Sequence, residues 1–125
     1  AGDHGTTYGG NPFVCTAVEK VLDLFQENHI IEHVGEVAPY LENCLDALKE
    51  KYDCILERRG VGLMQGLVFD RPVKDIIDRA LEEGLILINA GENVIRFLPP
   101  LIVSRANIDE MADILESCIE PDEER

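Results

Sequence analysis

Basic residues are scarce in this sequence, which has 11 lysines and arginines against 25 aspartates and glutamates and a formal net charge of −14 at pH 7. Proteins that bind nucleic acid cluster lysine and arginine against the phosphate backbone, so this balance argues against a nucleic-acid partner. The acids are spread along the chain rather than gathered in one patch. They therefore indicate solvated helix faces that keep the protein soluble.

Paired cysteines and long apolar segments are also missing. The four cysteines, Cys15, Cys44, Cys54 and Cys118, form no C-x-x-C pair, so neither a zinc site nor a disulfide framework is predicted. We expect reduced thiols, three of them in core positions, in a cytoplasmic protein. No apolar run approaches the length of about 20 residues that crosses a bilayer, and no signal segment opens the chain, so no membrane association is predicted.

The length and composition suit one compact domain, with 125 residues of which 46% are hydrophobic and 29% charged. The chain lacks an initial methionine and opens inside a glycine-rich loop, which suggests a piece of a longer protein. We predict a single domain over residues 1–125, with a loop at residues 1–11 and a charged tail at residues 121–125.

Apolar periodicity and turn residues predict alternating blocks of helix and strand. Asn11 and Pro12 form a helix-start signal, Gly84 a helix-stop signal, and Ser104 caps a final helix. Pro39 lies inside the second helix and predicts a kink or a break near residues 35–39. The predicted helices cover residues 12–27, 31–52, 72–83 and the segment after Ser104, and the predicted strands cover residues 54–59, 62–69, 85–89 and 94–97, with an irregular joint at residues 60–62. This order implies an α+β fold, a small mixed or antiparallel sheet of about four strands with helices on one side.

Catalytic equipment is sparse when the residues are judged alone. The histidines His4, His29 and His33 are not spaced for a nucleophilic triad. His29 and His33 are four residues apart and would suit a metal pair, but no third ligand accompanies them, so we interpret them as surface residues and predict no metal site. Cys15 has no evident base, and we assign it to helix packing.

The segment HGTTYGGNP, residues 4–12, is the most informative loop. Its small residues let the backbone approach a ligand, threonine hydroxyls can donate to phosphate oxygens, and the following helix start favours an anion. The loop lacks the Gly-Lys-Ser/Thr ending of a P-loop and the G-x-G-x-x-G dinucleotide fingerprint. The residues alone leave two interpretations open, a phosphate contact and a plain capped loop.

Two further segments join this loop in a family resemblance. They are RRGVGLMQG at residues 58–66 and GENVIRFLPPL at residues 91–101. In order and spacing, the three segments resemble motifs of the class III (fold-type I) aminotransferases, which depend on pyridoxal 5′-phosphate (PLP), and especially their acetylornithine and ornithine branch. The resemblance spans nearly all of residues 2–119 and implies the small C-terminal domain of such an enzyme.

The resemblance implies roles for three residues. Thr7 matches the threonine that binds the 5′-phosphate of the PLP held by the other subunit of a homodimer, and Thr6 matches a position near the substrate. Arg96 matches an arginine that engages a carboxylate, either of the amino-acid substrate or of a glutamate in the large domain. The alternative for Arg96 is a pair with a local acid. Arg59 and its following glycines we assign to turn geometry and packing.

A lysine that could form the Schiff base with PLP is not found. Lys20, Lys49, Lys51 and Lys74 lack the glycine-rich context of the family lysine, and we expect all four on exposed helix faces. The resemblance therefore implies that this lysine lies in the chain's own large domain, and that the present chain alone has no transaminase activity and holds no PLP covalently. Ornithine, succinylornithine and 4-aminobutyrate remain alternative amino donors, and a non-catalytic interaction domain remains an alternative of another class.

Overall fold

The computed structural model describes residues 5–119. The chain divides into two compact units, residues 1–32 and 33–125, which are described separately below. His4 and the predicted tail at residues 121–125 lie outside the described residues. None of the helices in the described part is long and apolar enough to cross a membrane.

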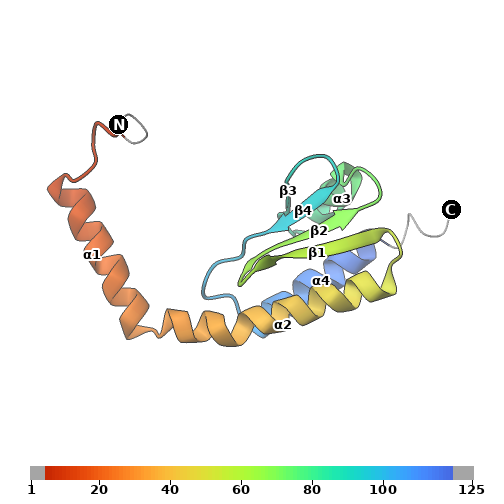
Figure 1. Ribbon diagram of the computed structural model, residues 1–125, viewed down its shortest axis with the longest axis horizontal. Coiled ribbons are helices and arrows are strands. Elements are labelled where there is room, and N and C mark those ends of the chain that lie inside the picture. Colours follow the sequence, from red (N-terminus) through yellow and green to blue (C-terminus); the bar gives the residue numbers. More distant parts are fainter. Residues whose placement is uncertain (1–4, 120–125) are drawn as a thin grey trace. The chain divides into compact units, whose positions relative to one another are not determined.

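The first unit contains the helix α1, Pro12–Glu27 (Figure 1). Asn11 has extended backbone angles, and its Oδ1 accepts a hydrogen bond from the Val14 N–H at 3.1 Å. Pro12 occupies the first helical position, where its missing N–H costs no helical bond. The predicted start and end of this helix are both confirmed, and none of its residues is buried.

The long helix α2, Ile30–Lys51, runs uninterrupted through Pro39. A break at residues 35–39 was therefore a wrong prediction. Pro39 removes one backbone hydrogen bond, but Val37, Ala38 and Leu41 around it are buried in the core. Burial of this apolar face stabilises the helix across the proline, as tertiary packing commonly does for helices.

Strands β1, Ile55–Val61, and β2, Met64–Phe69, form a tight hairpin. Pairing continues to Val61 and Met64, so only Gly62 and Leu63 remain in the turn. Gly62 has a φ of 59°, which is the requirement at the first central position of a type II′ turn. The predicted irregular joint at residues 60–62 is wrong, because the shift in register falls between Ile55 and Glu57.

The helix α3, Lys74–Glu82, ends as the sequence predicts. Gly84 has a φ of 89°, and the N–H groups of Gly84 and Leu85 donate to the carbonyls of Leu81 and Ala80. These two bonds define a Schellman motif, which satisfies the last carbonyls of the helix.

Strands β3, Ile88–Asn89, and β4, Val94–Phe97, complete a four-stranded sheet. The strand order is β1-β2-β4-β3, and every pairing is antiparallel. β4 has its predicted bounds, whereas β3 is shorter than the predicted strand over residues 85–89. The helix α4, Arg105–Ile119, follows, with the Ser104 Oγ accepting from the Asn107 N–H at 3.2 Å.

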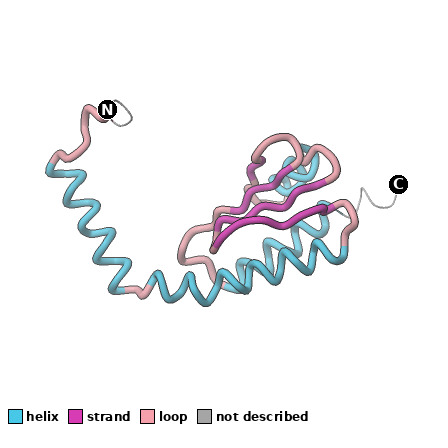
Figure 2. Tube along the Cα trace, viewed as in Figure 1, coloured by secondary structure: helices cyan, strands magenta, loops and turns pink. Residues whose placement is uncertain are grey.

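The hydrophobic core lies between one face of the sheet and the helices α2, α3 and α4 (Figures 1 and 2). α2 and α4 run side by side beneath the strands, joined by Tyr40–Asp109 and Lys51–Glu116 hydrogen bonds of 2.6 and 2.7 Å. The largest fully buried core side chains include Leu41, Leu45, Leu67, Phe69, Ile76, Ile95, Ile108 and Leu115. The predicted α+β class with helices on one side of an antiparallel sheet is confirmed, and within residues 33–119 no helix covers the opposite, outer face of the sheet.

Candidate functional site

Thr6 and Thr7 lie in the loop that precedes α1, and both are exposed. The loop folds back so closely that a Cβ atom added at Gly9 would lie 2.2 Å from the Cγ2 atom of Thr6. Gly10 has a φ of 75°, which favours glycine. The two glycines therefore allow the compact loop shape that presents the threonine hydroxyls.

The first turn of α1 contributes little to anion binding beyond these hydroxyls. Pro12 has no N–H, and the N–H groups of Val14 and Cys15 already donate to the side chain and the carbonyl of Asn11. Within the described residues, the N–H of Phe13 is left in this turn without an intrachain acceptor. The helix start therefore offers few free amides to an anion, since its cap uses most of them.

Arg96 lies on β4 and projects from the outer face of the sheet. It pairs in register with Gly66 of β2 and Ile88 of β3, and Gly66 pairs in turn with Arg59 of β1. Residues directly opposite each other on neighbouring strands share a face. Arg59, Gly66, Arg96 and Ile88 therefore form one row across the outer face.

A hollow of about 410 Å³ opens over this row. Its polar side chains include both arginines, and its remaining lining is largely apolar, with contributions from Val61, Met64, Ala90 and Val94. Gly66 lies between the arginines and adds no side chain to fill the space. Because apolar walls reduce competition from water, a carboxylate held here would bind a guanidinium more strongly than one in open solvent.

Arg58, the neighbour of Arg59 in the sequence, has an acidic partner that the two arginines of the row lack. Arg58 points to the helix face of the sheet, where its Nε donates to Asp46 at 2.7 Å and its Nη1 donates to Gln65 at 3.0 Å. Among the described residues, neither the Arg59 side chain nor the Arg96 side chain has a hydrogen bond or an ion pair. The alternative prediction, that Arg96 pairs with a local acid, is therefore not supported in spite of the many acids in the chain.

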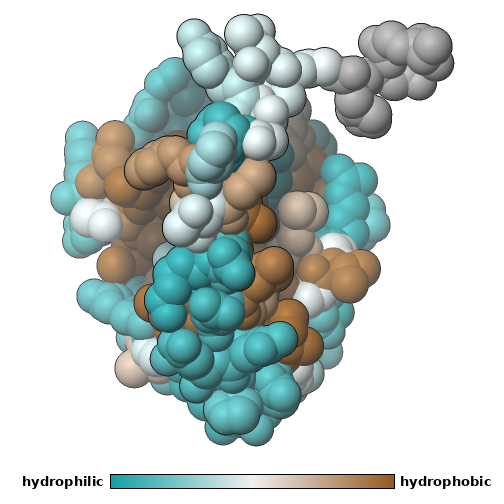
Figure 3. Space-filling view, turned by 90° about the vertical axis from the view of Figure 1, so that its left-hand side faces the viewer, coloured by the Kyte–Doolittle hydropathy of each residue, from teal (hydrophilic) through white to brown (hydrophobic). Residues whose placement is uncertain are grey.

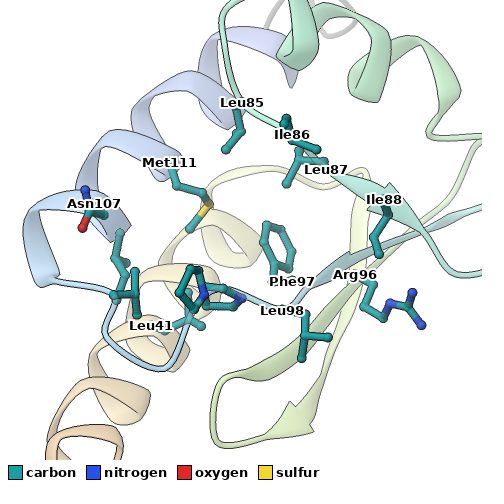
Figure 4. A pocket seen from close by; sticks show the side chains of 14 residues that line it. Leu41, Leu85, Ile86, Leu87, Ile88, Arg96, Phe97, Leu98, Asn107 and Met111 are labelled. Atoms are coloured by element: carbon teal, nitrogen blue, oxygen red, sulfur yellow. The ribbon is translucent and has the colours of Figure 1, made fainter. Parts of the chain in front are cut away.

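An apolar pocket of about 400 Å³ adjoins the other side of Arg96 (Figure 4). Residues 85–88 and 97–100 line it together with side chains of α2 and α4, among them Leu41, Phe97 and Met111. In Figure 4 the guanidinium of Arg96 points away from Phe97 and Met111. The arginine thus borders the pocket with its aliphatic part and leaves its charge outside.

The histidines and lysines that the sequence analysis considered as metal ligands or catalytic groups can also be located in the structure. Among the residues described, no group of histidine, cysteine and acidic side chains could hold a metal ion. His29 is exposed, whereas His33 is half-buried, with its Nε2 2.9 Å from the carbonyl oxygen of Val103. Lys20, Lys49, Lys51 and Lys74 are all exposed on helices, as expected.

The prediction of free thiols, three of them in core positions, is confirmed in part. Cys54 and Cys118 are buried, Cys44 is half-buried, and none of the four is in a disulfide. Burial raises the pKa of the Cys44 and Cys118 thiols, which keeps them protonated and unreactive. Cys15 is exposed on α1, so packing within the described residues does not explain it as the sequence reasoning proposed.

Two features were missed by sequence reasoning. Gln65 is 2% exposed and joins β2 to α2, since its Nε2 donates to Glu42 at 3.1 Å and to the Gly62 carbonyl at 2.7 Å. Arg59 was assigned to packing, yet it is exposed beside Gly66 in the row that contains Arg96. Arg96 can be selected from the sequence because it belongs to a motif, whereas the position of Arg59 beside it follows only from the strand register.

The structure leaves Thr6 and Thr7 in the first unit and Arg96 in the second. The two groups are therefore interpreted separately. The first unit has a loop without charged side chains in its described part and with two exposed threonine hydroxyls, and the second unit has a sheet face with two arginines. Both halves suit negatively charged groups.

Comparison with solved structures finds this fold in known aminotransferases. The structure matches solved aminotransferases, among them a lysine aminotransferase from M. tuberculosis, with a TM-score of 0.86 and 27% identity over 94% of this chain and 28% of that one. It also matches an acetylornithine aminotransferase from Elizabethkingia anophelis, with a TM-score of 0.84 and 27% identity over 97% and 31% of the two chains. An antiparallel sheet covered by helices on one face is thus a fold found in aminotransferases.

Sequence comparison identifies the family of the chain. The family model of class III aminotransferases matches residues 1–119, and the chain belongs to that family. It is 46% identical to an acetylornithine aminotransferase from Clostridium acetobutylicum over 94% of this chain and 31% of that protein. The chain therefore spans less than a third of the length of these relatives.

Proposed function

We propose that this chain is the C-terminal small domain of a PLP-dependent acetylornithine aminotransferase. The whole enzyme transfers an amino group between N-acetylornithine and 2-oxoglutarate, in arginine biosynthesis and in the cytoplasm. The observation that carries the proposal is Arg96, an exposed guanidinium without an acid partner in the described part of the chain, in the RFLPPL segment at the edge of a hollow. Every substrate of this reaction carries a carboxylate for such a group to bind.

The loop of the first unit fits the phosphate end of PLP. Thr6 and Thr7 present exposed hydroxyls, and the first turn of α1 has no acidic side chain to repel an anion. Thr7 would donate a hydrogen bond to a 5′-phosphate oxygen of the PLP held by the other subunit, and Thr6 would lie near the substrate. When bound, PLP supplies the electron sink that amino-group transfer requires.

Arg96 orients the substrate by its carboxylate. Its planar guanidinium can donate two parallel hydrogen bonds to one carboxylate, which fixes direction as well as position. Pro99 and Pro100 follow β4 and limit the backbone beyond it. The arginine therefore holds a carboxylate, of the substrate or of a glutamate of the large domain, in a defined direction.

The lysine that forms the Schiff base must come from elsewhere in the enzyme. Lys20, Lys51 and Lys74 have acidic partners at Glu27, Glu116 and Asp78, and Lys49 is exposed on α2. A catalytic lysine needs a desolvated setting that lowers its pKa, whereas the acidic partners raise the pKa of Lys51 and Lys74. The partners of this chain are its own large domain and a second subunit, and alone it is inactive.

Steady-state rates of the intact protein test this proposal. N-acetylornithine, ornithine, succinylornithine and 4-aminobutyrate serve as amino donors, with 2-oxoglutarate as acceptor. We expect the highest kcat/KM for N-acetylornithine. A higher value for 4-aminobutyrate or ornithine would contradict the substrate assignment, and no transfer from any of the four would contradict the function.

A further inference from the structure

Gln65 on β2 is a buried polar residue, 2% exposed, in a largely apolar core. Its Nε2 donates to a carboxylate oxygen of Glu42 at 3.1 Å and to the Gly62 carbonyl at 2.7 Å. Its Oε1 accepts from the Arg58 Nη1 at 3.0 Å. These partners define the orientation of the amide, because two acceptors face its nitrogen and a cationic donor faces its oxygen. A buried amide with both N–H groups bonded is held in one position.

The bonds of Gln65 connect three parts of the second unit. Glu42 lies one helical turn before Asp46 on α2, and Arg58 of β1 donates to Asp46 at 2.7 Å as well as to Gln65. Gly62 belongs to the turn of the β1–β2 hairpin. The helix, the strand and the turn are therefore joined through one side chain.

The end of this hairpin has little other attachment to the core. Leu63 is the one buried residue among residues 60–64, and Val61 is 85% exposed. Gly60 has no side chain to pack, and a Cβ atom there would lie 2.8 Å from the Oε1 of Gln65. The position of the hairpin end therefore depends on Leu63 and on the hydrogen bonds of Gln65.

The same hairpin end forms one wall of the hollow beside Arg96. Residues 59–61 and 64–66 line the hollow together with Arg96. Gly66, the residue after Gln65, pairs directly with Arg96 across β2 and β4. A displacement of the hairpin end would therefore change the width of the hollow next to the guanidinium.

We propose that Gln65 is a positioning residue for carboxylate binding, because its buried amide fixes the hairpin end against α2 and with it the wall of the hollow at Arg96. This inference rests on the proposed function, in which Arg96 receives a carboxylate. The side chain of Gln65 faces α2 and touches no substrate, so it acts through the wall. Both substrates of the reaction carry a carboxylate, and loss of Gln65 should weaken the binding of both alike.

Steady-state kinetics of Gln65→Met in the intact enzyme test this role, since methionine is similar in size and makes none of these hydrogen bonds. We expect the KM for N-acetylornithine and for 2-oxoglutarate each to rise by about fivefold or more. An interaction that serves the ground state and the transition state equally affects KM, so kcat should change by less than about twofold. Unchanged KM values, or a fall in kcat alone, would overturn the proposal.

A core substitution away from both hollows separates positioning from general stability. Ile76→Val on α3 removes one methyl group from a side chain that is 2% exposed, which lowers the free energy of unfolding. Neither KM should change in this variant. A rise in KM equal to that in Gln65→Met would mean that lost stability alone raises KM, and the proposal would be overturned.

A pair of substitutions at Glu42 replaces the test if circular dichroism shows that Gln65→Met is unfolded. Glu42→Gln keeps an oxygen that accepts from the Nε2 of Gln65, whereas Glu42→Leu removes it. Both KM values should rise in Glu42→Leu and stay within about twofold of the unmodified enzyme in Glu42→Gln. Equal KM values in the two variants would overturn the proposal.

Calorimetric titration with pentanoate distinguishes this inference from the proposed function, because it requires no turnover. The affinity of the intact protein for this monocarboxylate should fall by about fivefold or more in Gln65→Met. An unchanged affinity would overturn the positioning role even if the unmodified enzyme transfers amino groups. A reduced affinity in Gln65→Met, with no amino transfer by the unmodified protein, would support the positioning role and refute the proposed function.

Discussion

Asp46 and Arg58 connect α2 to β1 through a 2.7 Å hydrogen bond. This bond holds the pKa of Asp46 below its ordinary value, with a desolvation effect in the opposite direction that is smaller. Because the folded-state pKa is depressed, the pair stabilises the fold fully above the ordinary aspartate pKa of about 3.9. That contribution is lost as the pH falls from there through the folded-state pKa.

Arg58→Met should therefore raise the pKa of Asp46 toward its ordinary value. The stability that this pair contributes, and that the wild-type protein loses in acid, should then be absent. The effect on the free energy of unfolding is small, since the Asp46 side chain is 44% exposed and solvent screens the pair. Carbon NMR titration of the Asp46 carboxyl measures the shift. Lys74→Met, which breaks a pair on α3, should leave this titration unchanged, and a pKa of Asp46 that is equally low in Arg58→Met would contradict the assignment.

At the same scale, the sequence identifies some candidate site residues and not others. Arg96 belongs to a motif and could be selected from the sequence alone. Arg59 could not, because its face depends on a register that changes sides with every residue. The predicted strand ended at Arg59, whereas β1 continues to Val61, and only this continuation places Arg59 opposite Gly66.

The β1–β2 hairpin depends on glycine at position 60. Gly60 has a φ of 147°, and a Cβ atom there would lie 2.2 Å from the Met64 carbonyl oxygen and 2.8 Å from the Gln65 side chain. Gly60→Ala should therefore lower the free energy of unfolding by about 2 kcal/mol or more, from backbone strain and a clash with a buried network. Urea denaturation followed by circular dichroism measures the change.

Gly66→Ala in the same hairpin is the matched control. A Cβ atom at Gly66 meets Val94 at 3.5 Å, an ordinary contact, so the free energy of unfolding should change by less than about 1 kcal/mol. Equal destabilisation by the two substitutions would contradict the view that the hairpin needs glycine at position 60 because of its close contacts with Met64 and Gln65.

Among the elements, helices with clear periodicity were the most predictable. α1 and α4 begin at their predicted caps, because a cap is a local signal. β3 was overpredicted, since an apolar run such as residues 85–89 indicates burial without specifying pairing. Leu87 is buried, but only Ile88 and Asn89 pair with β4.

At the scale of the whole molecule, α1 presents an uncovered apolar surface. Val18, Val21 and Leu22 are 53%, 50% and 60% exposed. Figure 3 shows, on the side of the molecule that it views, hydrophobic side chains in brown exposed among hydrophilic ones in teal. An exposed stripe of this kind marks a surface for association. In the intact enzyme we assign it to contacts with the large domain or the second subunit.

We therefore expect the isolated 125-residue chain to self-associate with rising concentration in light scattering. Its net charge of −14 opposes association, so added salt should strengthen it by screening. Val18→Ser combined with Leu22→Ser should reduce association, whereas Gln26→Ser on the same helix should not. A monomer at every concentration and salt level would contradict this assignment of the stripe.

We propose above all that this chain lends hydroxyls to a cofactor site completed by other parts of the enzyme. Titration of PLP into the intact apoenzyme, followed by absorbance, tests that claim directly with Thr7→Val, which replaces the hydroxyl by a methyl group of similar size. Loss of one hydrogen bond to a charged phosphate predicts an affinity about tenfold or more below that of the unmodified enzyme. An unchanged affinity for PLP in Thr7→Val would contradict the claim.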